Sequence, residues 1–193
     1  MTTFLVVGLG NPGKDYAHTR HNAGADAVEL LAGRHNEKLK RDSKNRSLTA
    51  TTRMDDARVI LAFPQTYMNE SGAAVSALAS YYGVEDPTRI VIVHDELDIE
   101  VGRIKLKQGG GLAGNNGLRS IKAHLHTDAF LRVRIGIGKP PGKSHGANHV
   151  LTRPTKAEAQ LLAVTIEEAA DAVEKIVKDG IEAAMNAYNT RSE

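Results

Sequence analysis

The sequence predicts an α/β fold, a single domain with one twisted, mixed and mostly parallel β-sheet flanked by helices. Short apolar runs typical of buried strands alternate along the chain with segments of helical periodicity. The 193 residues are 41% hydrophobic and 25% charged, which is the composition of a globular protein. No linker, repeat or low-complexity segment divides them, so we expect one domain over residues 1–193.

The first half of the chain is expected to supply the centre of the sheet. Residues 3–9, 58–63 and 89–93 are apolar runs of the kind found in strands buried on both faces. Residues 46–53 alternate weakly, which is typical of an edge strand. Apolar spacing predicts helices between these strands, and Gly83 is a signal for the end of the second helix. The two helices are expected over residues 23–34 and 71–82.

The second half is expected to add strands with one charged face. Residues 103–107 and 130–137 alternate basic with apolar side chains. A Gly-rich loop over residues 109–117 leads into a helix over residues 116–126. The remaining expectations are a polar loop over residues 139–149 and a helical pattern from 156 to about 188 with a break near Gly180.

The composition excludes several classes of site. The absence of Cys removes disulfides, thiolate zinc sites, iron–sulfur clusters and Cys nucleophiles. No apolar run approaches the roughly 18–20 residues of a membrane span. The N-terminus also lacks the basic flank and apolar length of a signal peptide, so we expect a cytoplasmic protein. With 4% aromatic residues and no Trp, recognition by a platform of stacked bases is disfavoured.

Positive charge is concentrated in residues 103–153. This block holds 10 Lys and Arg against Asp128 alone, a net charge of +9, while the rest of the chain carries −7 to give the total of +2. A local excess of this size suggests a polyanionic partner. A solvated basic face without a partner explains the charge alone equally well.

Residues 8–13 match the G-x-G-x-x-G pattern of dinucleotide-binding proteins. That site needs a helix directly after the glycines and an acidic residue at the end of the next strand. Here the helical pattern begins near Asn22, and Asp26 and Glu29 fall inside it. The sequence therefore disfavours a nucleotide site.

Polar side chains follow the three apolar strands. Asn11 and His21 lie in the loop after the first, Asn69 follows the second, and Asp95 follows the third. Because binding groups gather at the carboxyl ends of strands in such sheets, we expect these four residues to share one crevice. A carboxylate fixes the tautomer of a neighbouring imidazole, so His21 and Asp95 with a bound water would form a general base for hydrolysis. Asn side chains suit a peptide backbone or an oxyanion.

Simpler interpretations of these residues stay open at this point. Asn69 and Asn116 both precede helical patterns, so they could serve only as helix caps. No G-x-S-x-G motif is present, so Ser71 is interpreted as part of a helix start rather than as a nucleophile. A metal site would lack any strong zinc spacing. Its candidate ligands are His18, His21, His94 and Asp95.

Several blocks resemble the bacterial peptidyl-tRNA hydrolase family, in the order of that family and over nearly the whole chain. They are residues 8–13, Tyr16, residues 19–22 (Thr-Arg-His-Asn) and Gly24, residues 64–72, residues 94–98 (His-Asp-Glu-Leu-Asp), residues 109–111 with 116–118, and residues 134–138. One block departs from the pattern. Residues 113–117 read Ala-Gly-Asn-Asn-Gly where the family usually has Gly-Gly-His-Asn-Gly, and Leu112 stands where His or Glu is common.

The resemblance implies a monomeric cytoplasmic carboxylic ester hydrolase that uses neither metal nor cofactor. Its reaction would cleave the ester between a peptide and the 3′-terminal ribose of tRNA, recycling tRNA from prematurely released peptidyl-tRNA. His21 would be the catalytic base and Asp95 its orienting carboxylate. The residues implied to contact the peptide end are Asn11, Tyr16, Met68, Asn69 and Asn116, and those implied to hold the tRNA 5′-phosphate are Lys107 and Arg134.

The alternative is a non-catalytic tRNA- or RNA-binding module that uses only the basic residues 103–153. Such a module has no need for a base and a carboxylate. The presence of both His21 and Asp95 therefore favours the hydrolase.

Overall fold

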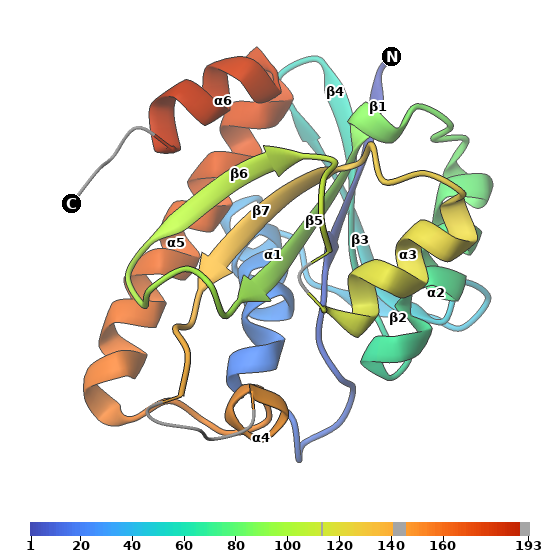
Figure 1. The fold of residues 1–193 in the computed structure, drawn as a ribbon. Coiled ribbons are helices and arrows are strands. Elements are labelled where there is room, and N and C mark those ends of the chain that lie inside the picture. Colours follow the sequence, from blue (N-terminus) through green and yellow to red (C-terminus); the bar gives the residue numbers. More distant parts are fainter. Residues whose placement is uncertain (113, 141–145, 190–193) are drawn as a thin grey trace.

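A seven-stranded sheet forms the centre of the protein (Figure 1). The structure is a computed structural model that describes residues 1–112, 114–140 and 146–189, so Ala113 of the Gly-rich block and Lys143 of the basic block lie outside it. The strands are β1 (Thr3–Gly8), β2 (Lys40–Asp42), β3 (Ser47–Met54), β4 (Ala57–Pro64), β5 (Ile90–Glu96), β6 (Ile104–Gln108) and β7 (Leu131–Gly136). Their order across the sheet is β2-β3-β4-β1-β5-β7-β6.

The sheet is mixed, as the sequence predicts. Its four central strands, β4, β1, β5 and β7, run parallel to one another. Antiparallel pairing is confined to the two margins, where β2 and β3 extend one side and β6 the other. All six strands expected from the sequence are present. The short strand β2 is additional, and its charged residues carry no apolar alternation that would have revealed it.

Helices cover both faces of the sheet (Figure 1). On the first face lie α1 (Ala23–Arg34), α5 (Lys156–Asp179) and α6 (Ile181–Tyr188), and on the second face α2 (Ser71–Tyr82) and α3 (Asn116–Leu125). Gly83, with a φ of 69°, ends α2 in the left-handed conformation, as expected. The break expected near Gly180 separates α5 from α6. Within the described residues, no helix has the length and apolar character to cross a membrane.

Three short turns of 3-10 helix and one short α-helix complete the fold. The turns are η1 (Arg20–Asn22), η2 (Met68–Glu70) and η3 (Pro87–Arg89). The expectation of a polar loop throughout residues 139–149 is wrong at its end, where α4 (Gly146–Val150) forms. No residue of α4 is buried, so apolar periodicity could not reveal it. Part of its support comes from Arg20, which donates to the His149 carbonyl.

Gly8, the first glycine of the G-x-G-x-x-G pattern, is needed for close packing of α1 against the sheet. A Cβ at Gly8 would overlap the carbonyl oxygen of Gly24, and a Cβ at Gly24 would overlap that of Val93. The two glycines therefore let α1 begin directly against β1 and β5. A long loop separates β1 from η1 and α1, so the immediate strand-to-helix turn of a dinucleotide site is missing, as the sequence indicates.

Candidate active site

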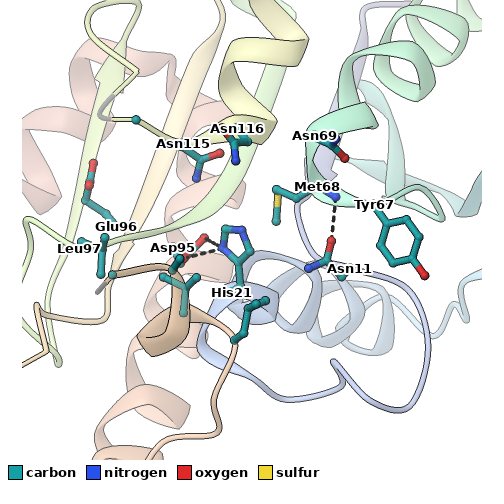
Figure 2. A pocket seen from close by; sticks show the side chains of 15 residues that line it. Asn11, His21, Tyr67, Met68, Asn69, Asp95, Glu96, Leu97, Asn115 and Asn116 are labelled. Carbon is teal, nitrogen blue, oxygen red and sulfur yellow. Dashed lines mark hydrogen bonds and ion pairs between the residues drawn. The ribbon is translucent and has the colours of Figure 1, made fainter. Parts of the chain in front are cut away.

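A cavity of about 470 Å³ opens at the carboxyl ends of β1, β4 and β5 (Figure 2). This is the edge at which the sequence predicts a crevice, and Asn11, His21, Asn69 and Asp95 all line it. The other lining residues are Tyr67, Met68, Glu96, Leu97, Gly114, Asn115, Asn116, Gly146, Ala147, Val150 and Leu151.

His21 and Asp95 are in direct contact within this cavity. The Nδ1 atom of His21 lies 3.0 and 2.9 Å from the two carboxylate oxygens of Asp95. η1, which follows the loop after β1, carries the imidazole, and β5 carries the carboxylate on the next parallel strand. Since a carboxylate accepts, Nδ1 carries the proton and the second ring nitrogen is left with a free lone pair. Figure 2 shows that nitrogen turned toward Asn116 at the other side of the cavity.

The surroundings of His21 raise its pKa above the ordinary 6.5. Burial alone lowers the pKa, but the charge of Asp95 and its hydrogen bond to the ring together outweigh that effect. The side chain of His21 is 14% exposed and that of Asp95 only 3%, so the pair interacts with little screening by water. The imidazole is thereby a stronger base than an isolated His, held in one tautomer.

The carboxamide of Asn11 has a fixed orientation. Its oxygen accepts a hydrogen bond of 2.7 Å from the backbone N–H of Met68, which leaves its NH₂ group as the part that can donate into the cavity. Asn22 holds the backbone of Asn11 from below, because its side chain donates to the Asn11 carbonyl and accepts from the Asn11 N–H, both at 2.9 Å. Asn22 follows His21 directly in the sequence, so the same turn of chain that carries the His21 imidazole also holds Asn11 in place.

The capping interpretation fails for two of the Asn residues and applies to a third. Asn69 lies in η2, and neither η2 nor α2 has a side-chain cap. Asn116 is the first residue of α3, whose cap is Asn115, with its side-chain oxygen accepting from Leu118 N at 3.0 Å. Asn69 and Asn116 are exposed at the cavity, with no capping role to occupy their amides. The residue that departs from the family pattern, Asn115, is thus the helix cap.

The other two residues that the resemblance implies as peptide contacts, Met68 and Tyr16, differ in their access to the cavity. Met68 is buried and lines the cavity. Tyr16 is not in the lining. Its ring packs edge-on against Tyr67, with 6.2 Å between the ring centres, and it is Tyr67 that faces the cavity. Leu112, the other departure, is partly buried and packs against the apolar cluster of the second face.

Neither Lys107 nor Arg134 is among the residues that line the cavity. In the antiparallel pairing of β6 with β7, Lys107 is opposite Arg132 and Lys105 is opposite Arg134. The four cations therefore share one face of the sheet, with Lys107 and Arg134 as diagonal neighbours. Arg134 approaches Glu96 at 4.0 Å, and its Nε is buried with no hydrogen-bond partner among the described residues. Burial lowers the pKa of Arg134, and the charge of Glu96 partly offsets this.

Of the four candidate metal ligands, only His21 and Asp95 are in contact through their side chains in the described part of the chain. In the described part of the chain, no three His, Asp or Glu side chains are grouped as a metal would require. His94 is fully buried, and both of its ring nitrogens already have partners. His18 is exposed and pairs with Asp26 at 3.4 Å. Ser71, interpreted as part of a helix start, is buried at the first turn of α2 and donates to the Met68 carbonyl.

Several residues around the site are not among the site residues expected from the sequence. Leu97, Val150 and Leu151 line the cavity with apolar side chains. Their local pattern does not distinguish them from core residues, although Leu97 lies within the block 94–98 that resembles the family. Arg20 is buried and ties α4 to η1, donating to His149 O at 3.2 Å, to the Thr152 hydroxyl and to Glu158 at 3.1 Å. The hints in the sequence were its position beside His21 and its place in the block 19–22 that resembles the family.

Comparison with known proteins gives consistent results. The sequence profile of the family described as peptidyl-tRNA hydrolase matches residues 5–193. A peptidyl-tRNA hydrolase of Mycolicibacterium vanbaalenii is 52% identical over 182 residues, 94% of each chain, and one of Frankia alni is 48% identical over 96% of this chain and 93% of its own. The crystal structure of peptidyl-tRNA hydrolase from Acinetobacter baumannii superposes with a TM-score of 0.91 at 42% identity, covering 97% of this chain and 95% of that one. The chain belongs to the peptidyl-tRNA hydrolase family.

Proposed function

We propose that this protein hydrolyses the ester between a peptide and the 3′-terminal ribose of tRNA, with His21 as the general base. The observation that carries the proposal is the contact between His21 Nδ1 and the Asp95 carboxylate inside a cavity lined by Asn side chains. This contact leaves the free nitrogen of the ring facing the open space of the cavity (Figure 2). A base held in one tautomer next to a set of neutral donors is what hydrolysis by water requires.

The reaction needs only water and the side chains present. The free nitrogen of His21 takes a proton from a water molecule as the water oxygen bonds to the ester carbonyl carbon. Asp95 stabilises the imidazolium that forms. The bond from that carbon to the ribose 3′ oxygen then breaks, and the proton passes from His21 to the departing oxygen. The products are a tRNA with a free 3′ hydroxyl and a peptide whose new carboxylic acid releases its proton to water as the carboxylate.

The Asn residues would hold the peptide backbone and polarise the carbonyl. Asn11 offers only its NH₂ group, since its oxygen is bound to Met68 N, so it suits a carbonyl oxygen. Asn69 and Asn116 are exposed and can both donate and accept, which suits a peptide bond. An aminoacyl-tRNA has no such peptide bond, so these contacts would favour peptidyl-tRNA. Tyr16 would act through Tyr67, against which its ring packs.

Lys107 and Arg134 would bind the 5′-phosphate of the tRNA. A terminal phosphate carries more charge than an internal one, and Arg can meet it with two parallel hydrogen bonds while Lys acts as a point charge. We further propose that the protein acts as a single-domain monomer in the cytoplasm.

The test is the substitution His21→Ala. General-base catalysis typically contributes about 10²–10⁴-fold, so turnover of peptidyl-tRNA should fall by that range while tRNA binding survives. The matched control is His18→Ala, which removes an exposed His of the same loop that does not line the cavity. Near-normal turnover in His21→Ala would remove His21 from the mechanism. Tight tRNA binding by a wild-type protein that releases no free tRNA would favour the non-catalytic RNA-binding module instead.

A further inference from the structure

A chain of hydrogen bonds, buried except at its last acceptor, runs from the end of β5 to Gly111 of the Gly-rich loop. The Nε of Arg132 donates to the Nε2 of His94 at 3.2 Å, and the Nη1 of Arg132 donates to the carbonyl of Gly111 at 2.7 Å. His94 in turn donates from Nδ1 to the carbonyl of Asp95 at 2.7 Å. The side chains of His94 and Arg132 are each 1% exposed. Asp95 stands at one end and the loop that leads to Asn115 and Asn116 at the other.

The partners of His94 leave it one protonation state. A guanidinium can only donate, so Nε2 must carry a lone pair, and a carbonyl can only accept, so Nδ1 must carry the hydrogen. Burial, followed by the positive charge of Arg132, lowers the pKa of His94 to about 3, so the ring is neutral at physiological pH. The charged groups that face it are Arg132 and Arg134 from β7 and His21 from η1.

Arg132 is an expensive residue to bury, and this calls for a reason. Burial, together with the nearby Arg134, lowers its pKa to about 10, and Glu96 offsets this only from 3.9 Å. An apolar residue at this position would extend the core of the second face, as its neighbours on β7 do on the first face. The guanidinium fork provides what an apolar side chain cannot, two directed hydrogen bonds to two different segments.

We propose that Arg132 and His94 are positioning residues, a rigid bridge that keeps Asp95 and the Gly-rich loop in register so that the base and the Asn116 amide meet the same substrate. This inference rests on the proposed function of the cavity. Neither residue touches the substrate. Their effect is exerted through the backbone of Asp95 on one side and that of Gly111 on the other. A displacement of about 1 Å at a catalytic group can cost up to about 10²-fold in rate.

Two substitutions of His94 separate the ends of the bridge. His94→Asn keeps an amide donor near the position of Nδ1, and His94→Gln keeps an acceptor near the position of Nε2. Both are neutral, like His94 itself, so neither changes the charge near the catalytic pair. We expect each to lower kcat by roughly 10-fold to 100-fold with KM changed less than kcat. The control is Thr165→Val, a buried hydroxyl on the first face whose loss should lower Tm without changing kcat.

The substitutions Arg132→Lys and Arg132→Met ask whether charge or geometry matters. Lys keeps the charge beside Glu96 but cannot donate to His94 and Gly111 from a planar fork, so both variants should lose activity alike. Full activity in Arg132→Lys would overturn the bridge, since charge alone would then suffice. Should Arg132→Met not fold, the two His94 variants and Arg132→Lys decide the question.

A readout independent of activity is the titration of the His21 ring by NMR. Because His94 is replaced by a neutral group, a lower His21 midpoint in His94→Asn or His94→Gln reports a looser contact with Asp95. Folded variants with an unchanged midpoint and wild-type kcat would overturn the proposal. A wild-type protein inactive on peptidyl-tRNA would instead overturn the proposed function, and the His21 titration would still decide whether the bridge positions Asp95.

Discussion

The two faces of the sheet differ most along β7 and β6. On the first face, Leu131, Val133 and Ile135 of β7 are at most 1% exposed beneath α5. On the second face, the same strand presents Arg132 and Arg134. β6 repeats the pattern, with Ile104 and Leu106 on the first face and Lys105 and Lys107 on the second.

The helices explain this difference. α5 and α6 cover β6 and β7 on the first face, whereas α2 and α3 form the second apolar cluster with β1, β4 and β5. Figure 1 views β6 and β7 from the second face, and none of the described helices lies in front of them. A strand covered on both faces needs apolar residues on both, and a strand covered on one can carry charge on the other. The cavity lies at the end of β5, where the apolar and basic parts of the second face meet.

The largest effect that the comparison predicts is on stability, from the covered face. Leu131→Ala should lower the free energy of unfolding by about 2–5 kcal/mol, because it leaves a cavity beneath α5. The control is Arg134→Ala, on the other face of the same strand, which should cost less stability because its side chain is 19% exposed. Urea unfolding of both variants measures this. Equal losses would show that both faces of β7 act as core.

Substitutions of the cations on the second face should affect tRNA binding rather than stability. Loss of Lys107 and Arg134 together should reduce the slope of log affinity against log salt by about 1.4, at about 0.7 per phosphate contact on a single strand. The preference for a 5′-phosphorylated tRNA should disappear while kcat on saturating substrate stays nearly constant. Lys122→Ala, which removes an exposed cation on α3, is the control and should leave that preference in place. The assignment fails if kcat/KM of the double variant still favours the 5′-phosphate.

The pH dependence of activity tests the contact between Asp95, on the first-face side of β5, and His21 in the cavity. Asp95 continues the side of β5 that carries Val91 and Val93, and it raises the pKa of His21. A base must be neutral to act, so the rate should fall on acidification with a midpoint above the ordinary 6.5 of His. Asp95→Asn removes the groups that raise the pKa and leaves burial, which lowers it, so the midpoint should move to lower pH and kcat should fall. A rate that is flat from about pH 8 to pH 5 would count against this base.

The sequence was sufficient for the parts of the site that depend on strand ends. Apolar runs locate β1, β4 and β5, and the carboxyl ends of parallel neighbours must meet, so the convergence of Asn11, Asn69 and Asp95 could be predicted. Arg132 could not. Its alternation with Val133 places it on the charged face, whereas its partners there are His94 on β5 and Gly111, some twenty residues earlier in the chain.

Other features depended on contacts between distant segments in the same way. α4 has no buried residue, and Arg20, more than a hundred residues away, is what fastens it to η1. The helix cap is Asn115, one residue before the expected Asn116, and apolar periodicity does not locate a helix boundary to within one residue.

The smallest expected effect concerns the N-terminus of α3, which borders the cavity on the second face. Asn115 accepts from Leu118 N at 3.0 Å, and loss of an Asn cap typically costs about 0.5–2 kcal/mol. Asn115→Ala should therefore lower the free energy of unfolding by about 1 kcal/mol, whereas Asn115→Ser should retain most of it because Ser is also a good cap. Since Asn116 follows the cap directly, fraying of this turn should also reduce kcat/KM in the Ala variant more than in the Ser variant. If both variants lose activity equally while the Ser variant keeps its stability, Asn115 contacts the substrate itself, because a cap alone would have been restored by Ser.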